Sequence, residues 1–273
     1  RQLEDSSDIV FFQNTTINEE MNSSIVFEAD AIIDSGAIIN GNITFKGAAR
    51  IKAGAKINGN IIADDSAAAL YVETEATIRG DINTEREFVV DSSNSIADEN
   101  LNIFGNIVAG GIGYTCGVND RQHRLSVFGN ISTNLFDIRT ITTIADDILN
   151  ITVSGDVNCG NLHLGGTTSN SVRGENIIYG DVNVDGDITS IYSSLAKGSN
   201  FHVNGDVICS TFTFRTQDSA TGISNLDADA AVVLINGKLS VNNGDLSLGY
   251  NNNTQAHKIY GSTYVNGNIR IFG

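Results

Sequence analysis

The segment Ile39-Asn40-Gly41-Asn42-Ile43 decides the fold, because its pattern returns along the whole chain. The pattern is an aliphatic residue, a variable residue, glycine, nearly always Asn or Asp, and a second aliphatic residue. Its ten copies begin at Ile39, Ile57, Ile78, Ile103, Val127, Val153, Ile178, Val203, Ile235 and Val265. Successive copies lie 18 to 32 residues apart, about 25 on average, which is a spacing typical of solenoids.

The pattern alternates with period two, as an extended strand does. Ile39 and Ile43 are therefore expected to point into a core, while Asn40 and Asn42 face outward. Helical repeats need apolar residues at a period of 3.6, and a propeller blade needs about 40 residues. We therefore predict an all-β fold, a single-stranded parallel β-helix (β-solenoid) of about ten coils stacked about 4.8 Å apart. Glycine is expected to let the chain bend at a corner or let the next coil approach closely.

The composition agrees with a strand-rich protein that has an acidic surface. Charged residues make up 18% of the chain and proline is absent, as expected where nearly every backbone N–H joins a ladder. The net charge of −16 argues against nucleic acid and anionic membranes as partners, because both need a basic surface. No apolar run approaches the roughly 18 residues of a membrane span, so we expect no membrane insertion.

The repeat divides the chain into two regions. Residues 1–30 lie outside it and are predicted to form an N-terminal strand that caps the first coil or pairs with another subunit. Residues 31–273 form the predicted solenoid domain, in which the longer later steps indicate longer sides or loops. The last strand has no polar cap after it, although solenoid ends normally need one. The candidate self-assembly residues in the two terminal segments are Ile9, Val10, Phe11, Phe12, Ile269, Ile271 and Phe272.

The first coils resemble those of the bactofilins, which are polymer-forming β-solenoid proteins of bacteria. The resemblance lies in the steps of about 18 residues and in the Ile-Asn-Gly-Asn-Ile turns at 39–43 and 57–61, and it covers residues 31–82. It implies a compact β-helix that stacks end to end into filaments without a nucleotide. The longer later coils and the Asn-, Ser- and Thr-rich surface depart from a small cytoskeletal bactofilin, and they favour a secreted filament subunit.

Residues 181–188 match the start of an EF-hand-like calcium loop. Oxygen ligands alternate with other residues and Gly186 occupies the sixth position, as such a loop requires. The twelfth position is Tyr192 rather than an acid, and no helical pattern follows, so an ordinary strand-turn-strand is the alternative. Apart from calcium, the sequence indicates no cofactor. The candidate calcium ligands are Asp181, Asn183, Asp185 and Asp187.

Asp156, Asp181 and Asp206 follow the repeat glycine in three successive coils. If the coils are in register, these carboxylates stack about 5 Å apart and repel one another. Outward splaying, a bound cation or raised pKa values would relieve the repulsion. Asn occupies the same position in other coils, where it predicts a ladder of stacked side chains.

The chain contains three cysteines, Cys116, Cys159 and Cys209. Cys159 and Cys209 both follow the repeat glycine by four residues but lie about two coils apart, which is too far for a disulfide. We therefore expect buried free thiols, and the odd count leaves room for one bridge between subunits.

Six Asn-x-Ser/Thr sequons are candidate glycosylation sites if the protein is secreted. A chain this rich in Asn, Ser and Thr would contain about five of them by chance, so they carry little weight alone. They begin at Asn14, Asn22, Asn42, Asn130, Asn150 and Asn252.

No catalytic constellation emerges from the sequence. Arg50-Ile51-Lys52 matches part of a motif of polysaccharide-cutting β-helix enzymes, but it stands too early in the chain and no Gly-His-Gly accompanies it. The Asp pairs at 64–65 and 146–147 are adjacent in sequence, so strand geometry points their side chains to opposite faces. The four histidines lack metal-ligand spacing. We therefore expect that the protein is not an enzyme.

The sequence thus favours a structural, self-assembling subunit of an extracellular or cell-surface filament or layer. The subunits would join end to end through the solenoid termini and the N-terminal strand, so the main partner is a second copy of the chain. One alternative is a carbohydrate-binding or adhesive β-helix at the cell surface, with glycans as partners. A polysaccharide-degrading β-helix enzyme is a third interpretation.

Overall fold

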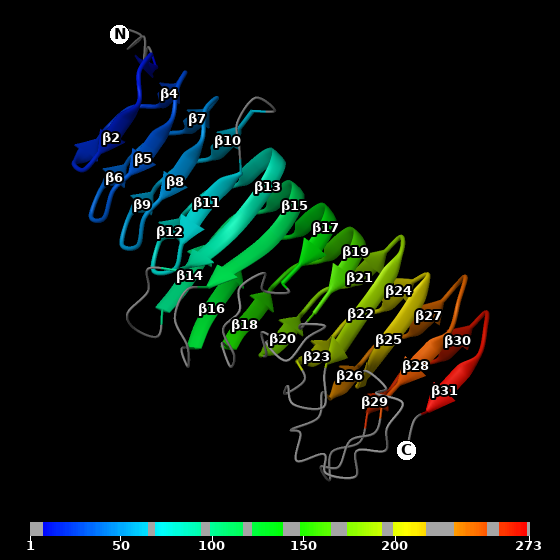
Figure 1. The fold of residues 1–273 in the computed structure, drawn as a ribbon. Helices are drawn as coiled ribbons and strands as arrows, with labels where there is room; N and C mark the ends of the chain where they lie inside the picture. The colour runs from blue at the N-terminus through cyan, green and yellow to red at the C-terminus, as the bar shows by residue number, and fades with distance from the viewer. Residues whose placement is uncertain are drawn as a thin grey trace, which may run out of the picture.

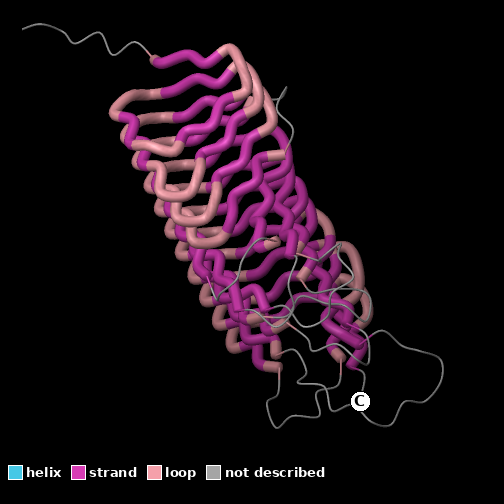
Figure 2. The backbone as a smooth tube through the Cα atoms, turned by 60° about the vertical axis from the view of Figure 1, so that its left-hand side comes forward, coloured by secondary structure: helices cyan, strands magenta, loops and turns pink. Residues whose placement is uncertain are grey.

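Parallel strands stack into a long rod in a computed structural model of the protein (Figures 1 and 2). The structure describes residues 8–64, 69–93, 99–116, 122–138, 148–164, 174–192, 199–216, 232–249 and 257–271. These residues form strands and turns and no helix, and hence no helix that could cross a membrane. The prediction of an all-β parallel solenoid is confirmed.

Each coil contributes strands to three faces of the rod, which we call faces 1, 2 and 3. Face 1 contains β1 (Ile9–Phe11), β4 (Ile25–Phe27), β7 (Ile43–Phe45), β10 (Ile61–Ala63), β21 (Val182–Val184), β24 (Val207–Cys209), β27 (Leu239–Val241) and β30 (Thr263–Val265). Face 2 contains β2 (Thr15–Ile17), β5 (Ala31–Ile33), β8 (Ala49–Ile51), β11 (Leu70–Glu73), β22 (Asp187–Tyr192), β25 (Thr211–Thr216), β28 (Leu246–Leu248) and β31 (Ile269–Ile271).

Four long strands run through both of these faces and join them into one 20-stranded sheet. They are β13 (Ile82–Ser92), β15 (Ile107–Cys116), β17 (Ile131–Asp137) and β19 (Val157–His163). Face 3 is a separate 11-stranded sheet. It contains β3 (Glu20–Met21), β6 (Ile38–Ile39), β9 (Lys56–Ile57), β12 (Thr77–Ile78), β14 (Glu99–Ile103), β16 (Gln122–Val127), β18 (Ile148–Val153), β20 (Glu175–Ile178), β23 (Asn200–Val203), β26 (Val233–Ile235) and β29 (Lys258–Ile259).

The repeated motif crosses the corner at which face 3 leads into face 1, which we call the motif corner. Its first aliphatic residue ends a face 3 strand and its second begins a face 1 strand. Ile39 therefore pairs with Ile57, and Ile43 pairs with Ile61. All four side chains are fully buried, so the two aliphatic columns of the motif form much of the core, as predicted.

The last copy of the motif differs from the prediction. The glycine that stacks on Gly237 at the motif corner is Gly261, which follows β29. Residues 265–269 instead cross from face 1 to face 2, because β31 pairs with β28. There Gly267 packs against the carbonyl of Gly244. The predicted register at 265–269 is therefore wrong, because a second corner of the coil uses the same glycine-containing sequence.

The solenoid begins earlier than the predicted domain boundary. β1 pairs in parallel with β4, and β2 pairs with β5, in the register of the later coils. Ile17 and Phe27 are buried in the same core, and Phe11 stacks on Phe27 with ring centroids 5.3 Å apart. Residues 9–30 therefore belong to the stacked coils, and the strand pairing shows no break between them and the next coil.

Most of the added length of the later coils enters at the corner between face 2 and face 3. Four residues separate β8 from β9, whereas 16 separate β25 from β26. In two early coils this corner is a tight turn with a positive φ at Gly36 (81°) and Gly54 (79°), which glycine adopts without strain. The sides lengthen as well, since β13 spans 11 residues, so the expectation of longer sides is confirmed.

Glycine is required at the motif corner because consecutive coils approach each other closely there. A Cβ atom on Gly59 would overlap the backbone carbonyl of Gly41. At Gly129 it would lie 2.6 Å from the carbonyl oxygen of Gly105, closer than real Cβ contacts. Of the two roles that the sequence suggested for glycine, close approach of the next coil is therefore directly supported.

Replacing Gly129 with Ala is expected to lower the free energy of unfolding by about 1–3 kcal/mol, because the methyl group forces two coils apart. Gly111→Ala is the matched control, since its Cβ would meet its nearest neighbours at an ordinary 3.8 Å. Urea denaturation of both variants measures the difference. Equal losses of stability in the two variants would contradict the close-approach explanation.

Candidate functional site

A column of Asn and Asp side chains runs along the motif corner and links each coil to the next. The Oδ1 atom of each residue accepts a hydrogen bond from the backbone N–H of the equivalent residue one coil later. The acceptor–donor pairs are Asn42–Asn60 (2.9 Å), Asn60–Asp81 (2.9 Å), Asp81–Asn106 (2.7 Å), Asn106–Asn130 (2.8 Å), Asn130–Asp156 (2.8 Å), Asp156–Asp181 (2.8 Å), Asp181–Asp206 (2.7 Å) and Asp206–Lys238 (2.8 Å). We call this set the corner column. It bonds mainly side chain to backbone, and one bond between side chains, of the kind that the sequence predicted, accompanies it: Asn106 Nδ2 donates to Asp81 Oδ1 at 3.1 Å.

The corner column explains how three aspartates stack in successive coils. Asp156, Asp181 and Asp206 each direct one carboxylate oxygen at a backbone N–H of the next coil. Hydrogen bonds to a charged acceptor are stronger than those between neutral groups, and they offset part of the repulsion. Asp156 and Asp181 are also exposed to water, which screens their charges. Backbone hydrogen bonds and exposure to water thus relieve part of the repulsion between the stacked carboxylates.

The four candidate calcium ligands lie along an extended segment. Asp181 stands at the motif corner, Asn183 lies on the outer side of β21, and Asp187 begins β22 on face 2. Gly180-Asp181 and Gly186-Asp187 are two successive corners of one coil, and the N–H of Asp187 donates to Asn161 Oδ1 at 2.9 Å. Two Gly-Asp corners on either side of a strand therefore create the EF-hand-like spacing.

An EF-hand loop wraps its ligands around one ion, whereas the extended β21 spreads them along the coil. Among the described residues, no three His, Cys, Asp or Glu side chains converge to hold a metal ion. Calcium binding by Asp181, Asn183, Asp185 and Asp187 stays a prediction, and the strand geometry does not favour it.

Most of the sequon asparagines that the structure describes have a role in coil stacking. The Oδ1 atoms of Asn42 and Asn130 accept corner-column bonds, Asn22 accepts from Asn40 (2.6 Å), and Asn150 accepts from the N–H of Glu175 (2.9 Å). Asn14 is exposed, and Asn252 lies outside the described residues. Stacking thus accounts for many of the asparagines that head sequons, and their glycosylation stays a prediction.

Cys159 and Cys209 are buried free thiols on the inner side of face 1, as the sequence predicted. Burial, together with the nearby carboxylates of Asp185 and Asp187, raises the pKa of each thiol to about 12. Both cysteines are therefore protonated and unreactive at neutral pH. The structure does not describe the side chain of Cys116.

The four histidines, which the structure describes, do not form a shared site. His257 accepts a hydrogen bond from the N–H of Val233 through Nδ1 (3.2 Å), and its Nε2 contacts the carbonyl of Gly249 (3.0 Å). His163 lies on face 2, while His123 and His202 lie on face 3 in different coils. Asp65, Asp146 and Asp147 lie outside the described residues.

The sequence did not predict an ion-pair cluster that joins three coils on face 2. Arg50 Nη1 in β8 lies 3.2 Å from Glu73 Oε1 in β11 and 2.5 Å from Asp91 Oδ2 in β13. Its guanidinium also lies 5.0 Å from the ring centroid of Tyr71. Burial lowers the pKa of Arg50, but the bonds to Asp91 and Glu73 outweigh it and raise the pKa above its ordinary value. The single positive charge of Arg50 compensates one of the two buried carboxylate charges. Its contacts also link three successive coils.

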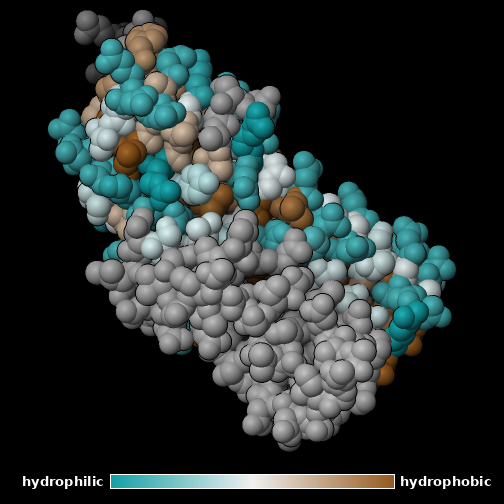
Figure 3. All heavy atoms as spheres, viewed as in Figure 1, coloured by the Kyte–Doolittle hydropathy of each residue, from teal (hydrophilic) through white to brown (hydrophobic). Residues whose placement is uncertain are grey.

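The two ends of the described rod leave apolar side chains uncovered, and we call them the end layers. In the first, Ile9 is 37% and Phe12 is 76% exposed. In the last, Ile269 is 60% and Ile271 is 66% exposed, and Figure 3 shows hydrophobic atoms at that end of the rod. The side chains equivalent to Ile9, Ile269 and Ile271 in the adjacent coils are the buried Ile25, Leu246 and Leu248, whereas Phe12 follows β1 at an outward position.

Among the other candidate assembly residues, Val10 is exposed and points outward from β1. Phe11 is half-buried because its ring stacks on Phe27 in the next coil. Phe272 lies outside the described residues. Ile9 and Phe11 thus lie at one end of the described rod, and Ile269 and Ile271 lie at the other.

Neither a protein-family model, nor a curated protein, nor a solved structure matches this chain.

Asp181→Asn is expected to keep the stability of the protein, because the amide oxygen still accepts the N–H of Asp206. Asp181→Ala removes the acceptor and is expected to lower the free energy of unfolding by about 1 kcal/mol. Urea denaturation with and without calcium tests both. If calcium stabilises the wild type and both variants lose that effect equally, Asp181 is a metal ligand instead.

In a Cys116→Ser background, Cys159 and Cys209 are expected to stay unreactive toward a disulfide reagent at pH 8 until the protein is unfolded. The buried thiols are protonated and shielded at that pH. Ser132→Cys adds a thiol on the outer side of β17 and serves as the reactive control. Rapid labelling of the native protein without that control thiol would contradict the buried placement.

Proposed function

We propose that the protein is a structural subunit that assembles end to end into a filament or layer, outside the cell or at its surface. The observation that carries the proposal is the exposure of core-facing residues at both end layers, above all Ile269 and Ile271. Edge strands with uncovered apolar side chains are templates for pairing with another strand. The bactofilin-like pattern of the first coils favours the same role.

The strand register of the rod can be continued onto a second copy on two faces. Placing β1 of the next copy beside β30 aligns Val265 with Phe11, both at inward positions. Placing β2 beside β31 aligns Ile271 with Ile17, again at inward positions. These pairs have the same apolar character as the columns inside the rod, so the joint would bury side chains that are now exposed.

Face 3 supplies less to such a joint. Its last described strand is β29, which lies one layer before β30 and β31. A copy stacked in register on faces 1 and 2 would therefore leave one layer of face 3 without a described strand. The proposed joint therefore depends on faces 1 and 2. Because the first and last layers differ, the contact is head to tail and repeats without closing, which is how filaments form.

Other features support a structural role. The corner column and the buried aliphatic columns run through nearly the whole described chain and serve coil stacking. The acidic, polar outer surface keeps such a rod soluble and separates neighbouring rods sideways through charge repulsion. Assembly would then be confined to the two ends.

Ile271→Glu is expected to raise the protein concentration needed for assembly by about 10- to 100-fold, because it places a charge at the inward side of the joint. Ile62→Glu is the matched control, since Ile62 is an exposed isoleucine on the outer side of face 1 in mid-rod. Sedimentation velocity and negative-stain electron microscopy measure assembly, with and without calcium.

The proposal fails if the wild type stays monomeric up to about 100 µM under both conditions. It also fails if Ile271→Glu assembles as the wild type does. A loss of assembly in both Ile271→Glu and Ile62→Glu would mean that side-by-side contacts, rather than the end layers, hold the subunits together.

A further inference from the structure

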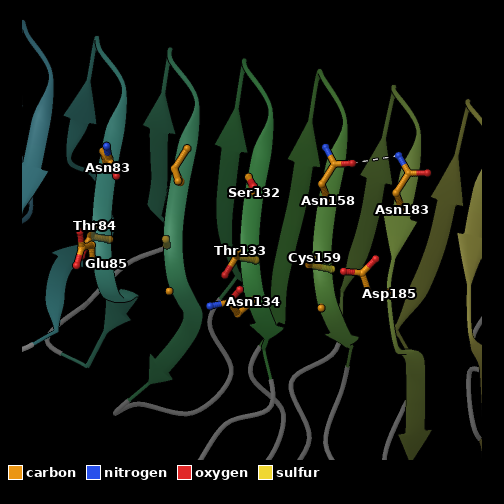
Figure 4. A pocket seen from close by; sticks show the side chains of 14 residues that line it. Asn83, Thr84, Glu85, Ser132, Thr133, Asn134, Asn158, Cys159, Asn183 and Asp185 are labelled. Carbon is orange, nitrogen blue, oxygen red and sulfur yellow. Dashed lines mark hydrogen bonds between the residues drawn. The ribbon is translucent and has the colours of Figure 1, made fainter. Parts of the chain in front are cut away.

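A groove of about 560 Å³ crosses the outer surface of the rod where face 1 bends into face 2. It extends over five consecutive coils, from β13 through β15, β17 and β19 to β21 (Figure 4). Its volume lies within the range of small-ligand sites. The polar side chains that line it include Asn83, Glu85, Ser132, Asn134, Asn158 and Asp185.

The shape of the groove follows from the residues at the bend. Glu85, Asn134 and Asp185 occupy the bend position in alternate coils, and glycine occupies it in the coils between. A Cβ on Gly110 would overlap the carbonyl of Glu85, and one on Gly160 would overlap that of Asn134, so larger residues do not fit there. The floor of the groove therefore has hollows between its polar side chains.

The polar groups in the groove are free to bind a ligand, unlike those of the corner column. In the described chain, the side chains of Asn83, Glu85 and Asn134 have no hydrogen-bond partner, whereas each corner-column oxygen is used in stacking. Asn158 Oδ1 accepts from Asn183 Nδ2 at 3.1 Å (Figure 4), which leaves a donor on Asn158 and an acceptor on Asn183. The groove thus offers both donors and acceptors.

The chemistry of the lining limits the class of ligand. The described lining contains no Lys or Arg, and its charged groups are the carboxylates of Glu85 and Asp185, so an anionic ligand would be repelled. Its strands pair on both sides within the sheet, so a peptide could not add as a further strand. A chain of neutral hydroxyl groups fits amides and carboxylates, because a hydroxyl both donates and accepts.

We propose that this groove binds a neutral, linear oligosaccharide that lies along the rod axis. Polar side chains line four of the five coils, and the coils are about 4.8 Å apart, so the groove offers polar groups repeatedly along its length, which suits a ligand that is itself a repeating chain. The site lies in mid-rod, away from both end layers, so it is independent of end-to-end assembly. An assembled rod would present one such groove per subunit.

Isothermal titration calorimetry with cellohexaose, xylohexaose, mannohexaose and chitohexaose tests the proposal, with polygalacturonate as the anionic comparison. We expect at least one neutral hexasaccharide to bind at concentrations up to about 1 mM, with little dependence on salt, and polygalacturonate not to bind. Asn134→Ala is expected to weaken that binding by about tenfold, since it removes hydrogen bonds to the ligand. Asn102→Ala is the matched control, because Asn102 lies on face 3.

Ser132→Arg provides a second variant if Asn134→Ala does not fold. It fills the groove from the outer side of β17 and is expected to abolish binding, and circular dichroism verifies that the strands persist. The proposal is overturned if none of the four hexasaccharides binds, if polygalacturonate binds more tightly than they do, or if Asn134→Ala and Ser132→Arg bind as the wild type does. Tests of assembly are separate, because Ile271→Glu leaves the groove unchanged.

Discussion

The structure depends on the short distance between consecutive coils at the motif corner. Backbone ladders hold neighbouring strands about 4.8 Å apart, and at this corner one glycine carbonyl lies against the next glycine. That contact allows the side-chain oxygen of the following Asn or Asp to reach the N–H of the next coil. It also aligns the two aliphatic columns of the core. A side chain at the glycine position would disturb all three arrangements together.

The sequence predicted the fold and the core from this local constraint, because every motif copy contains its own glycine, Asn or Asp, and aliphatic residues. It did not identify which corner a copy occupies. Residues 265–269 satisfy the same pattern at another corner, where the N–H of Asn268 donates to Asp245 Oδ1 at 2.8 Å. The motif corner and the corner between face 1 and face 2 use the same glycine and the same side-chain to backbone bond, so the local sequence pattern does not distinguish them. The same similarity gave residues 181–188 the spacing of a calcium loop.

The candidate sites were only partly predictable, because each combines residues from several coils. The apolar end layers could be read directly, since they lie in continuous segments at the ends of the chain. The Arg50, Glu73 and Asp91 cluster and the mid-rod groove could not. The three members of the cluster are 18 to 41 residues apart, and the varying length of the coils hides which residues become neighbours. The pairing register of successive coils must be known before such sites can be recognised.

Whereas three residues separate the strands at the motif corner in every described coil, the corner between face 2 and face 3 varies most in length from coil to coil. Coils there differ by a dozen residues in the length of the connection, yet the strands on both sides keep their parallel register. Connections of very different length at that corner are therefore compatible with the same core and the same corner column. Along this edge of the rod, each coil can therefore carry a surface segment of its own length without any change in the strand pairing.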